Sequence, residues 1–274
     1  LLLTIPVLVA VSTIVFFLIH AIPGDPVDII LGEQALSADR VRLADELHLN
    51  EPVIKQYGVF MKGIVTGNWG ISLFDRQPVM EHIAGRFTAT LMLAVCALFV
   101  LVVIAIPTGI FSAVKRGTFL DQLAMFTALI GISVPNFWLG PVLILIFSVH
   151  FGWLPISGRD SLVSLILPSI TLGAALAAML SRLTRSSVIE EIKKDYVTAA
   201  RAKGLSERAV ILRHAFRNAM NPVITILGLQ VGTLLAGTVI TEKIFNWPGL
   251  GMLLLDSINR RDYPLVQGCI LVIT

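Results

Sequence analysis

The stretch that decides how this chain folds is Asp195-Tyr196-Val197-Thr198-Ala199-Ala200-Arg201-Ala202-Lys203-Gly204-Leu205-Ser206. It is basic, polar and helix-forming, yet it lies between two long apolar segments, residues 162–180 and 222–240. A polar segment in that position is typical of a loop on one side of a membrane. We therefore interpret residues 195–206 as an ordered loop outside the membrane and as a candidate docking element.

The composition indicates a membrane protein. Of 274 residues, 55% are hydrophobic and 14% are charged, and the mean hydropathy is +0.84. Soluble domains carry about 25% charged residues. A large soluble protein with a very apolar core is the alternative, but apolar runs of ~20 residues, the length that crosses a bilayer, recur here. The net charge of +3 is too small to indicate nucleic-acid binding. Cys96 and Cys269 lie in apolar runs and are interpreted as core residues.

Apolar spans account for most of the chain and predict an all-α membrane protein with about six transmembrane helices. They cover residues 1–20, 87–114, 120–149 with breaks at Pro135 and Pro141, 162–180, 222–240, and a last span from Pro264 onward. A cleaved signal peptide is the alternative for residues 1–20, but no small-residue cleavage site follows this long run. Because both ends of the sequence lie in apolar runs, we expect a short N-terminal tail and the rest of a last helix to be missing.

Charge asymmetry between the polar segments sets the orientation. Residues 21–86 carry nine acidic and six basic residues, whereas the loop 181–221 carries nine basic and four acidic residues. Lys and Arg concentrate in cytoplasmic loops. We therefore place the loop 181–221 inside, and residues 21–86 and 150–161 outside. Both ends of a complete six-span chain then lie in the cytoplasm.

The predicted organisation has three parts: a first transmembrane helix (residues 1–20), an extracytoplasmic insert (21–86) and a core (87–274) with a cytoplasmic loop at 185–221. Within the insert, Ser37 is expected to be the N-cap of a short helix that runs through about Leu47.

The cytoplasmic loop is predicted to hold two short helices around a glycine. Helical spacing runs from Ile189 to Lys203, and Glu190 precedes Lys194 by four residues, the favourable order for a salt bridge. Gly204 suits the left-handed position after a helix, and Ser206 suits the N-cap of the next. The second helix has an apolar side made of Val210, Ile211, Ala215 and Ala219. An amphipathic helix lying on lipid headgroups is an open alternative for this loop.

Two runs of this loop resemble a known family. Residues 195–205 and the run Arg213-His214-Ala215-Phe216-Arg217-Asn218-Ala219-Met220-Asn221-Pro222-Val223 are similar to the EAA loop of ABC-importer permeases, in the branch that serves dipeptides, oligopeptides, glutathione and nickel. The generic pattern is Glu-Ala-Ala with Gly four residues after the second Ala. Here Thr198 replaces the Glu, and the spacing to Gly204 is kept.

The resemblance extends over nearly the whole chain. It includes Ile22-Pro23-Gly24-Asp25-Pro26, Gly67-Asn68-Trp69-Gly70-Ile71-Ser72, Val134-Pro135-Asn136-Phe137-Trp138, Phe245-Asn246-Trp247-Pro248-Gly249-Leu250-Gly251 and Arg261-Asp262-Tyr263-Pro264. The short loop between the third and fourth spans is closer to glutathione- and nickel-type permeases. The sequences around Lys203 and Asp262 are more similar to those of dipeptide permeases.

The resemblance implies a type I ABC-importer permease of the bacterial cytoplasmic (inner) membrane. Such a subunit is not an enzyme and binds no cofactor, since ATP and Mg²⁺ lie on partner subunits. The implied partners are a second homologous permease, two ATPase subunits and an extracytoplasmic solute-binding protein that docks on residues 21–86, with no nucleic acid. The implied substrate is a dipeptide or oligopeptide, with glutathione or nickel as alternatives. The residues implied to couple to the ATPase are Tyr196, Thr198, Ala199, Ala200, Arg201, Lys203, Gly204 and Leu205.

Candidate pathway residues are weaker. Gln230 lies between Gly228 and Gly232, a Gly-x-x-x-Gly pattern that permits close helix packing, either within the chain or at a seam with a second permease. A polar side chain deep in a span is itself a candidate pathway residue. Asn136 and Trp247 are further candidates, and Ser133 and Thr171 are weaker ones. The run 245–251 is either a re-entrant turn at the external gate or a plain connecting loop.

Other chemistries lack their sequence signals. No Gly-x-x-x-x-Gly-Lys-Ser/Thr run occurs, so we expect no P-loop, and the five histidines have no spacing suited to a metal. A self-contained secondary transporter is the alternative of another class. Its usual marks are intramembrane ionisable residues and inverted repeats, and the spans here are nearly free of acids and bases.

Overall fold

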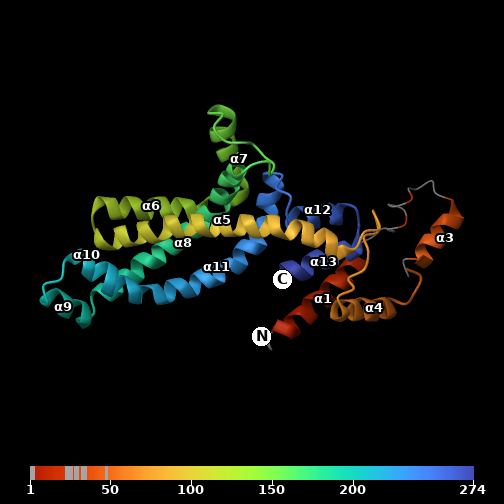
Figure 1. Cartoon of the computed structure of the whole chain (residues 1–274), viewed down its shortest axis with the longest axis horizontal. Coiled ribbons are helices and arrows are strands. Elements are labelled where there is room, and N and C mark those ends of the chain that lie inside the picture. Colours follow the sequence, from red (N-terminus) through yellow and green to blue (C-terminus); the bar gives the residue numbers. More distant parts are fainter. Residues whose placement is uncertain (1–3, 22–26, 28–30, 32–35, 47–48) are drawn as a thin grey trace. The chain divides into compact units, whose positions relative to one another are not determined.

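The computed structural model describes residues 4–21, 27, 31, 36–46 and 49–274, and these residues are almost entirely helical (Figure 1). The helices are α1 (Thr4–Ala21), α3 (Ser37–Glu46), α4 (Val53–Thr66), α5 (Val79–Val114), α6 (Phe119–Ser133), α7 (Asn136–Leu143), the π-helix η1 (Ile144–His150), the 3-10 helix η2 (Leu162–Leu165), α8 (Ile166–Ile192), α9 (Asp195–Ala202), α10 (Glu207–Ala209), the π-helix η3 (Val210–Ala215), α11 (Phe216–Ile244), α12 (Leu250–Asn259) and α13 (Tyr263–Ile273). The predicted all-α class is confirmed. The run Ile22-Pro23-Gly24-Asp25-Pro26 lies outside the described residues.

The chain forms two compact units. The first joins Leu1–Ala89 to Pro248–Thr274, and the second is Thr90–Trp247. In the first unit, the start of α5 packs against α12 and α13 through Val79, Ile83, Leu250, Leu253, Leu265 and Cys269. The buried Asp262 accepts hydrogen bonds from Ser72 Oγ (2.5 Å) and Leu73 N (3.2 Å), so it fastens the turn before α5 to the start of α13.

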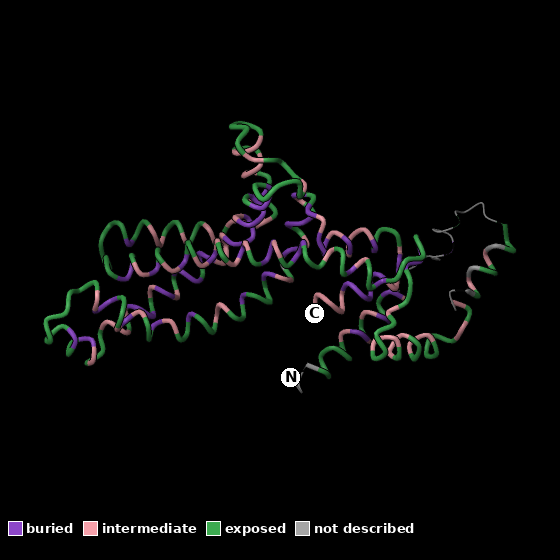
Figure 2. The backbone as a smooth tube through the Cα atoms, viewed as in Figure 1, coloured by how far each residue is buried: buried purple, intermediate pink, exposed green. Residues whose placement is uncertain are grey.

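In the second unit, α5, α6 and α11 all pack along α8 (Figure 1). Two glycines bring α5 and α8 close together. A Cβ on Gly109 would lie 2.6 Å from Thr184 Cβ, and a Cβ on Gly173 would lie 2.7 Å from the Ala97 carbonyl oxygen. Figure 2 shows the resulting buried seam along the bundle. These two contacts leave no room for a side chain, so α5 and α8 meet backbone to backbone.

Three described helical segments are long and apolar enough to cross a membrane: Val79–Val114, Leu162–Ile192 and Glu207–Ala236. A fourth crossing is available if Phe119–Ser133 and Asn136–His150, which meet at a bend of 104°, form one broken span. The bend falls at the predicted break at Pro135. The predicted break at Pro141 is wrong, because α7 continues through it into η1.

The helices extend beyond the predicted apolar spans through polar residues. The helix α5 begins at Val79, before the predicted start at Phe87. The helix α8 runs past Leu180 to Ile192, so residues 181–192 of the predicted loop are helical. Ser181 and Thr184 donate hydroxyl hydrogen bonds to the carbonyl oxygens of Ala178 (2.9 Å) and Leu180 (2.8 Å). Neither hydroxyl is therefore left unpaired inside the helix.

The helix that contains the predicted fifth span, residues 222–240, extends beyond it at both ends. Helix continues without a break from Glu207 through η3 and α11 to Ile244, and Pro222 lies inside α11. Glu242, which the sequence analysis placed in a loop, is therefore helical. The short helix predicted from Ser37 is confirmed as α3, with Ser37 as its first residue and not its N-cap.

Candidate coupling loop

The loop between α8 and α11 contains two helices around a glycine, as predicted. Gly204 has φ +77°, the left-handed region that favours glycine. Ser206 caps α10, because its Oγ accepts from Ala209 N at 3.4 Å. The first helix differs from the prediction. α8 ends at Ile192, and the chain turns at Lys193 and Lys194 before α9 begins.

That turn changes the predicted ion pair. Lys194 bonds to Glu191 with Nζ 2.5 Å from Oε1, so the predicted partner Glu190 is wrong. Tyr196 donates its hydroxyl to the other oxygen of Glu191, also at 2.5 Å. Burial, followed by this hydrogen bond, raises the pKa of the Tyr196 hydroxyl. Tyr196 therefore stays protonated at neutral pH and holds α9 against the end of α8.

The two faces of α9 have different environments. Val197 and Ala200 are buried with Val210 and Ala215, against the partly buried Ile192 and Tyr196. The neighbouring Ala199 is exposed. Both alanines are among the residues implied to couple to an ATPase, but Ala200 packs inside the loop and only Ala199 is exposed.

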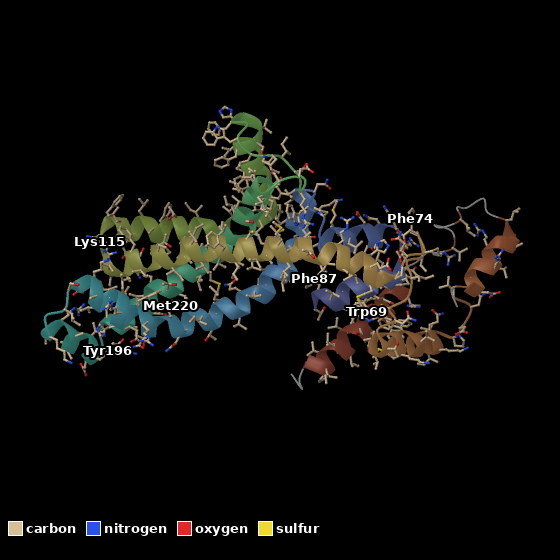
Figure 3. The ribbon with its side chains drawn as sticks, viewed as in Figure 1. Trp69, Phe74, Phe87, Lys115, Tyr196 and Met220 are labelled. Carbon is tan, nitrogen blue, oxygen red and sulfur yellow. The ribbon has the colours of Figure 1, made fainter. Side chains whose placement is uncertain are left out.

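The exposed surface of the loop is small and basic. Within residues 195–206, the exposed residues are Asp195, Thr198, Ala199, Arg201, Ala202, Lys203, Gly204, Leu205 and Ser206. Arg201 closes the glycine turn with a two-bond clamp on Glu207, Nε to Oε2 at 3.0 Å and Nη2 to Oε1 at 2.6 Å. Figure 3 places Tyr196 and Lys115 at the same end of the second unit. The loop is therefore a preformed surface at one end of the helices.

The candidate pathway residues lie elsewhere in the second unit, and the structure does not bring them together with the loop. Gln230 is 5% exposed, donates Nε2 to Met179 Sδ at 3.7 Å, and has a buried Oε1 with no hydrogen-bond partner among the described residues. Asn136 opens α7 and likewise has an unpaired buried oxygen within the described chain. Trp247 is fully buried, and the Arg159 guanidinium lies 5.9 Å from the centre of its ring.

The weaker candidates bond to their own helices. Thr171 is buried and Ser133 is exposed, and each donates to a carbonyl one turn earlier. The run 245–251 separates α11 from α12, with Asn246 at φ 47°. Only residues 245–249 leave the helix, because α12 starts at Leu250.

Gly228 and Gly232 do not pack within the described chain. Both are exposed, and a Cβ added to either would meet no atom of the described residues within 4 Å. These glycines therefore make no close contact inside the second unit. Close packing instead uses Gly109 and Gly173, which have no recurring spacing that sequence reasoning could detect.

Two buried carboxylates were missed. Glu242 is fully buried and accepts from Thr90 Oγ1 at 2.6 Å. Asp121 is 3% exposed and forms a two-bond ion pair with Arg185, which sequence analysis counted only as a loop charge. The sequence did contain a signal for the second pair, because Asp121 lies five residues after Arg116, at the start of an apolar run.

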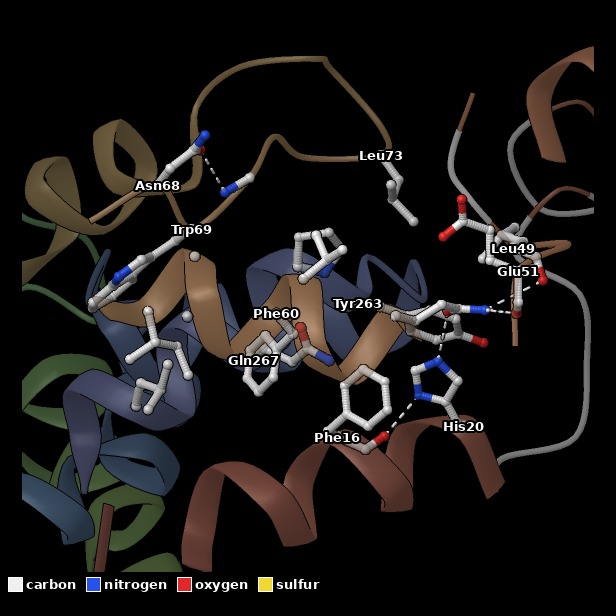
Figure 4. A pocket seen from close by; sticks show the side chains of 18 residues that line it. Phe16, His20, Leu49, Glu51, Phe60, Asn68, Trp69, Leu73, Tyr263 and Gln267 are labelled. Carbon is white, nitrogen blue, oxygen red and sulfur yellow. Dashed lines mark hydrogen bonds between the residues drawn. The ribbon is translucent and has the colours of Figure 1, made fainter. Parts of the chain in front are cut away.

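The first unit contains a cavity of about 220 Å³ between α1, α4 and α13 (Figure 4). Aromatic rings of Phe16, Phe60 and Tyr263 line it. His20 lies at its edge, with Nδ1 2.8 Å from the Phe16 carbonyl oxygen and Nε2 3.1 Å from Gln56 Oε1. These contacts hold α4 against α1.

The long apolar helices and the ordered basic loop at one end of them define an integral membrane protein. Comparison with known proteins identifies its family. The model of the binding-protein-dependent transport system inner membrane component matches residues 105–274, and the N-terminal model of the same transport-system membrane components matches residues 1–94.

Curated relatives agree over nearly the whole chain. The dipeptide transport system permease protein DppB of Escherichia coli K12 is 43% identical over 303 residues, covering 99% of this chain and 89% of DppB. The glutathione transport system permease protein GsiC of the same strain is 46% identical over 268 residues, covering 98% of this chain and 88% of GsiC. The chain therefore belongs to the inner-membrane permeases of binding-protein-dependent ABC importers.

Proposed function

We propose that this permease forms the translocation path for a dipeptide or other short peptide that a solute-binding protein delivers. The support is the likeness to DppB, whose name states dipeptide transport, at 43% identity over 99% of this chain. Glutathione is the second candidate, favoured by the 46% identity to GsiC. Neither name concerns nickel. Because the family consists of transport components, we propose that the chain has no catalytic activity and that ATP and Mg²⁺ bind only to partner subunits.

The exposed face of α9 and the Gly204 turn would dock on an ATPase subunit. The observation that carries this proposal is the division of α9 into a packed face, with Val197 and Ala200, and an exposed face, with Ala199 and Ala202. The packed face fixes the loop to α8 and η3, so the exposed face would move only together with these helices. Closure of the ATPase subunits would then displace the spans through residues 195–217.

We further propose six spans, with both ends of the complete chain in the cytoplasm. Beyond the long segments, α1 and α13 are apolar helices that would supply the remaining crossings. Residues 21–86 would lie outside and receive the solute-binding protein. This orientation rests on the nine basic residues of 181–221 and on the charge balance of the insert.

Gln230, Asn136 and Trp247 are proposed to lie at the path or its gate. The unpaired oxygens of Gln230 and Asn136 support this for two of them, because a buried acceptor without a partner is costly and gains a bond when water or solute reaches it. The open face around Gly228 and Gly232 would receive the second permease.

The test is uptake in cells that lack this gene, with labelled dipeptide and labelled nickel in parallel and unlabelled glutathione as competitor. We expect dipeptide uptake to disappear and to return with the wild-type gene. Nickel uptake should not change. Loss of nickel uptake alone would overturn the peptide proposal. Strong competition by glutathione would assign the second candidate. Uptake that persists when the ATPase subunits are removed would contradict the ATP-driven mechanism.

A further inference from the structure

The ion pair Asp121–Arg185 joins α6 to α8 next to the coupling loop. Arg185 donates Nε to Asp121 Oδ1 and Nη2 to Asp121 Oδ2, both at 2.7 Å. Gly117 N adds a third hydrogen bond to Oδ2 at 2.9 Å. The side chain of Asp121 is 4% exposed and that of Arg185 is 26% exposed. Such two-bond guanidinium–carboxylate pairs fix orientation as well as distance.

The three partners come from three separate parts of the second unit. Gly117 belongs to the turn after α5, Asp121 to the first turn of α6, and Arg185 to α8. The pair therefore joins residues 64 positions apart in sequence. Because charges buried at the edge of a bilayer are costly unless they are paired, the partners resist separation.

α8 is also the helix that carries the coupling loop. Arg185 lies two turns before Ile192, where α8 ends, and only Lys193 and Lys194 separate that end from α9. Displacement of α9 is therefore passed directly to α8, as it is to η3. Around Arg185, α8 is already fixed to α5 by Gly109 and to α11 by Val188, which packs with Ala219.

The contact between α8 and α6 differs from these packing contacts because it includes an ion pair. Farther along, the two helices meet at Gly131 and Ala178, where a Cβ on Gly131 would lie 3.2 Å from Ala178 Cβ. Apolar contacts of this type are non-directional and allow one helix to slide along another. The Asp121–Arg185 pair is the directional contact at the end nearest the coupling loop.

We propose that Asp121 and Arg185 are positioning residues that transmit displacement of the coupling loop from α8 to α6, and so to the bent pair α6–α7. This inference rests on the proposed function, since it assumes that an ATPase subunit moves α9. The pair would keep α6 in step with α8 during closure. Without it, ATP hydrolysis would continue while less solute is moved in each cycle.

The experiment uses the complete transport complex in lipid vesicles, with complex yield, ATP hydrolysis and labelled dipeptide uptake measured on the same preparations. The variants are Arg185→Lys, which keeps the charge and loses the two-bond fork, Asp121→Asn, and the double variant Asp121→Asn/Arg185→Gln. Arg182→Lys is the matched control, because Arg182 lies on the same helix, is exposed, and has no ion pair within the described chain.

We expect Arg185→Lys and Asp121→Asn to keep complex yield within about twofold and to lower the dipeptide moved per ATP at least ~5-fold, the lower end of ordinary coupling effects. The double variant should be no worse than the poorer single variant, since both remove one interaction. Arg182→Lys should match the wild type.

The inference is overturned if both single variants move as much dipeptide per ATP as Arg182→Lys. It is also overturned if hydrolysis and uptake fall in proportion to complex yield, or if even Arg185→Lys fails to assemble, since the pair would then serve folding alone. If only Asp121→Asn fails to assemble, the dipeptide moved per ATP by the Arg185→Lys complex decides whether the inference holds. A wild-type complex without ATP-dependent uptake would instead contradict the proposed function.

Discussion

α8 and α11 pack against each other, yet they have different surroundings. In the most apolar window of Leu162–Ile192, 56% of residues are buried, whereas the corresponding share for Glu207–Ala236 is 22%. The glycines of these helices differ in the same way. Gly109 and Gly173 lie where α5 and α8 are in close contact, whereas a Cβ added to Gly228 or Gly232 on α11 would meet no described atom within 4 Å. The difference separates a helix that is packed within the second unit from one that leaves a face of that unit open.

The largest expected effect comes from replacing glycine by valine once in the α5–α8 contact, at Gly109, and once on the open face of α11, at Gly228. In Gly109→Val the new Cβ would lie 2.6 Å from Thr184 Cβ and 2.8 Å from the Ser181 carbonyl oxygen, so backbone must move. Overpacking of this kind costs about 1–3 kcal/mol or more. We expect a loss of at least ~10-fold in properly folded protein, measured by size-exclusion chromatography in detergent. Gly228→Val is the matched control and should keep its yield; equal losses would refute the contrast.

The next largest effect is expected at the Gly204 turn, which lies in the loop between α8 and α11. Valine at position 204 would have to adopt φ +77°, which costs an L-residue roughly 1–2 kcal/mol and a β-branched residue more. We expect Gly204→Val to assemble and hydrolyse ATP but to move much less peptide per ATP in vesicles. Gly204→Asn tolerates left-handed geometry and should be milder. Unchanged uptake in Gly204→Val would count against the docking role.

Gly232→Leu addresses the open face of α11. Because no described atom lies within 4 Å of the new Cβ, the isolated chain should keep its thermal stability. The complex should form less well if a second permease covers this face, since leucine would hold the backbones apart. Melting in detergent and co-purification of the second permease measure the two effects. Normal co-purification would remove Gly232 from the seam.

The smallest effect concerns the exposed clamp across the glycine turn. The side chains of Arg201 and Glu207 are 37% and 58% exposed, so their ion pair contributes at most about 1 kcal/mol. Arg201→Ala should therefore speed hydrogen exchange in residues 201–207 only slightly, and added salt should reduce the difference from wild type. A large change would show that the clamp is better shielded than its exposure indicates.

Local rules predicted from sequence what depends on neighbouring residues. Gly204 and Ser206 were assigned correctly because a left-handed turn and an N-cap have their own residue preferences. The break at Pro135 follows in the same way, since the residue before proline disfavours helix.

Features that depend on distant partners were not predictable. α8 continues past Leu180 partly because Arg185 finds Asp121, 64 residues away in sequence. Ala200 turns inward because Val210 and Ala215 return to cover it. Close packing falls on Gly109 and Gly173, where only the partner helix shows the need for glycine. Burial of Glu242 likewise depends on Thr90, on another helix.

Site-specific cross-linking to the ATPase subunit tests the coupling loop most directly. Ala199→Cys and Ala200→Cys are adjacent in α9, but position 199 is exposed and position 200 is 5% exposed. In the assembled complex, a short thiol–amine cross-linker should join position 199 to an ATPase subunit and should leave position 200 and the wild-type protein, with Cys96 and Cys269, unlinked. Failure at position 199, or equal linking from both positions, would contradict the account of α9 as the docking surface.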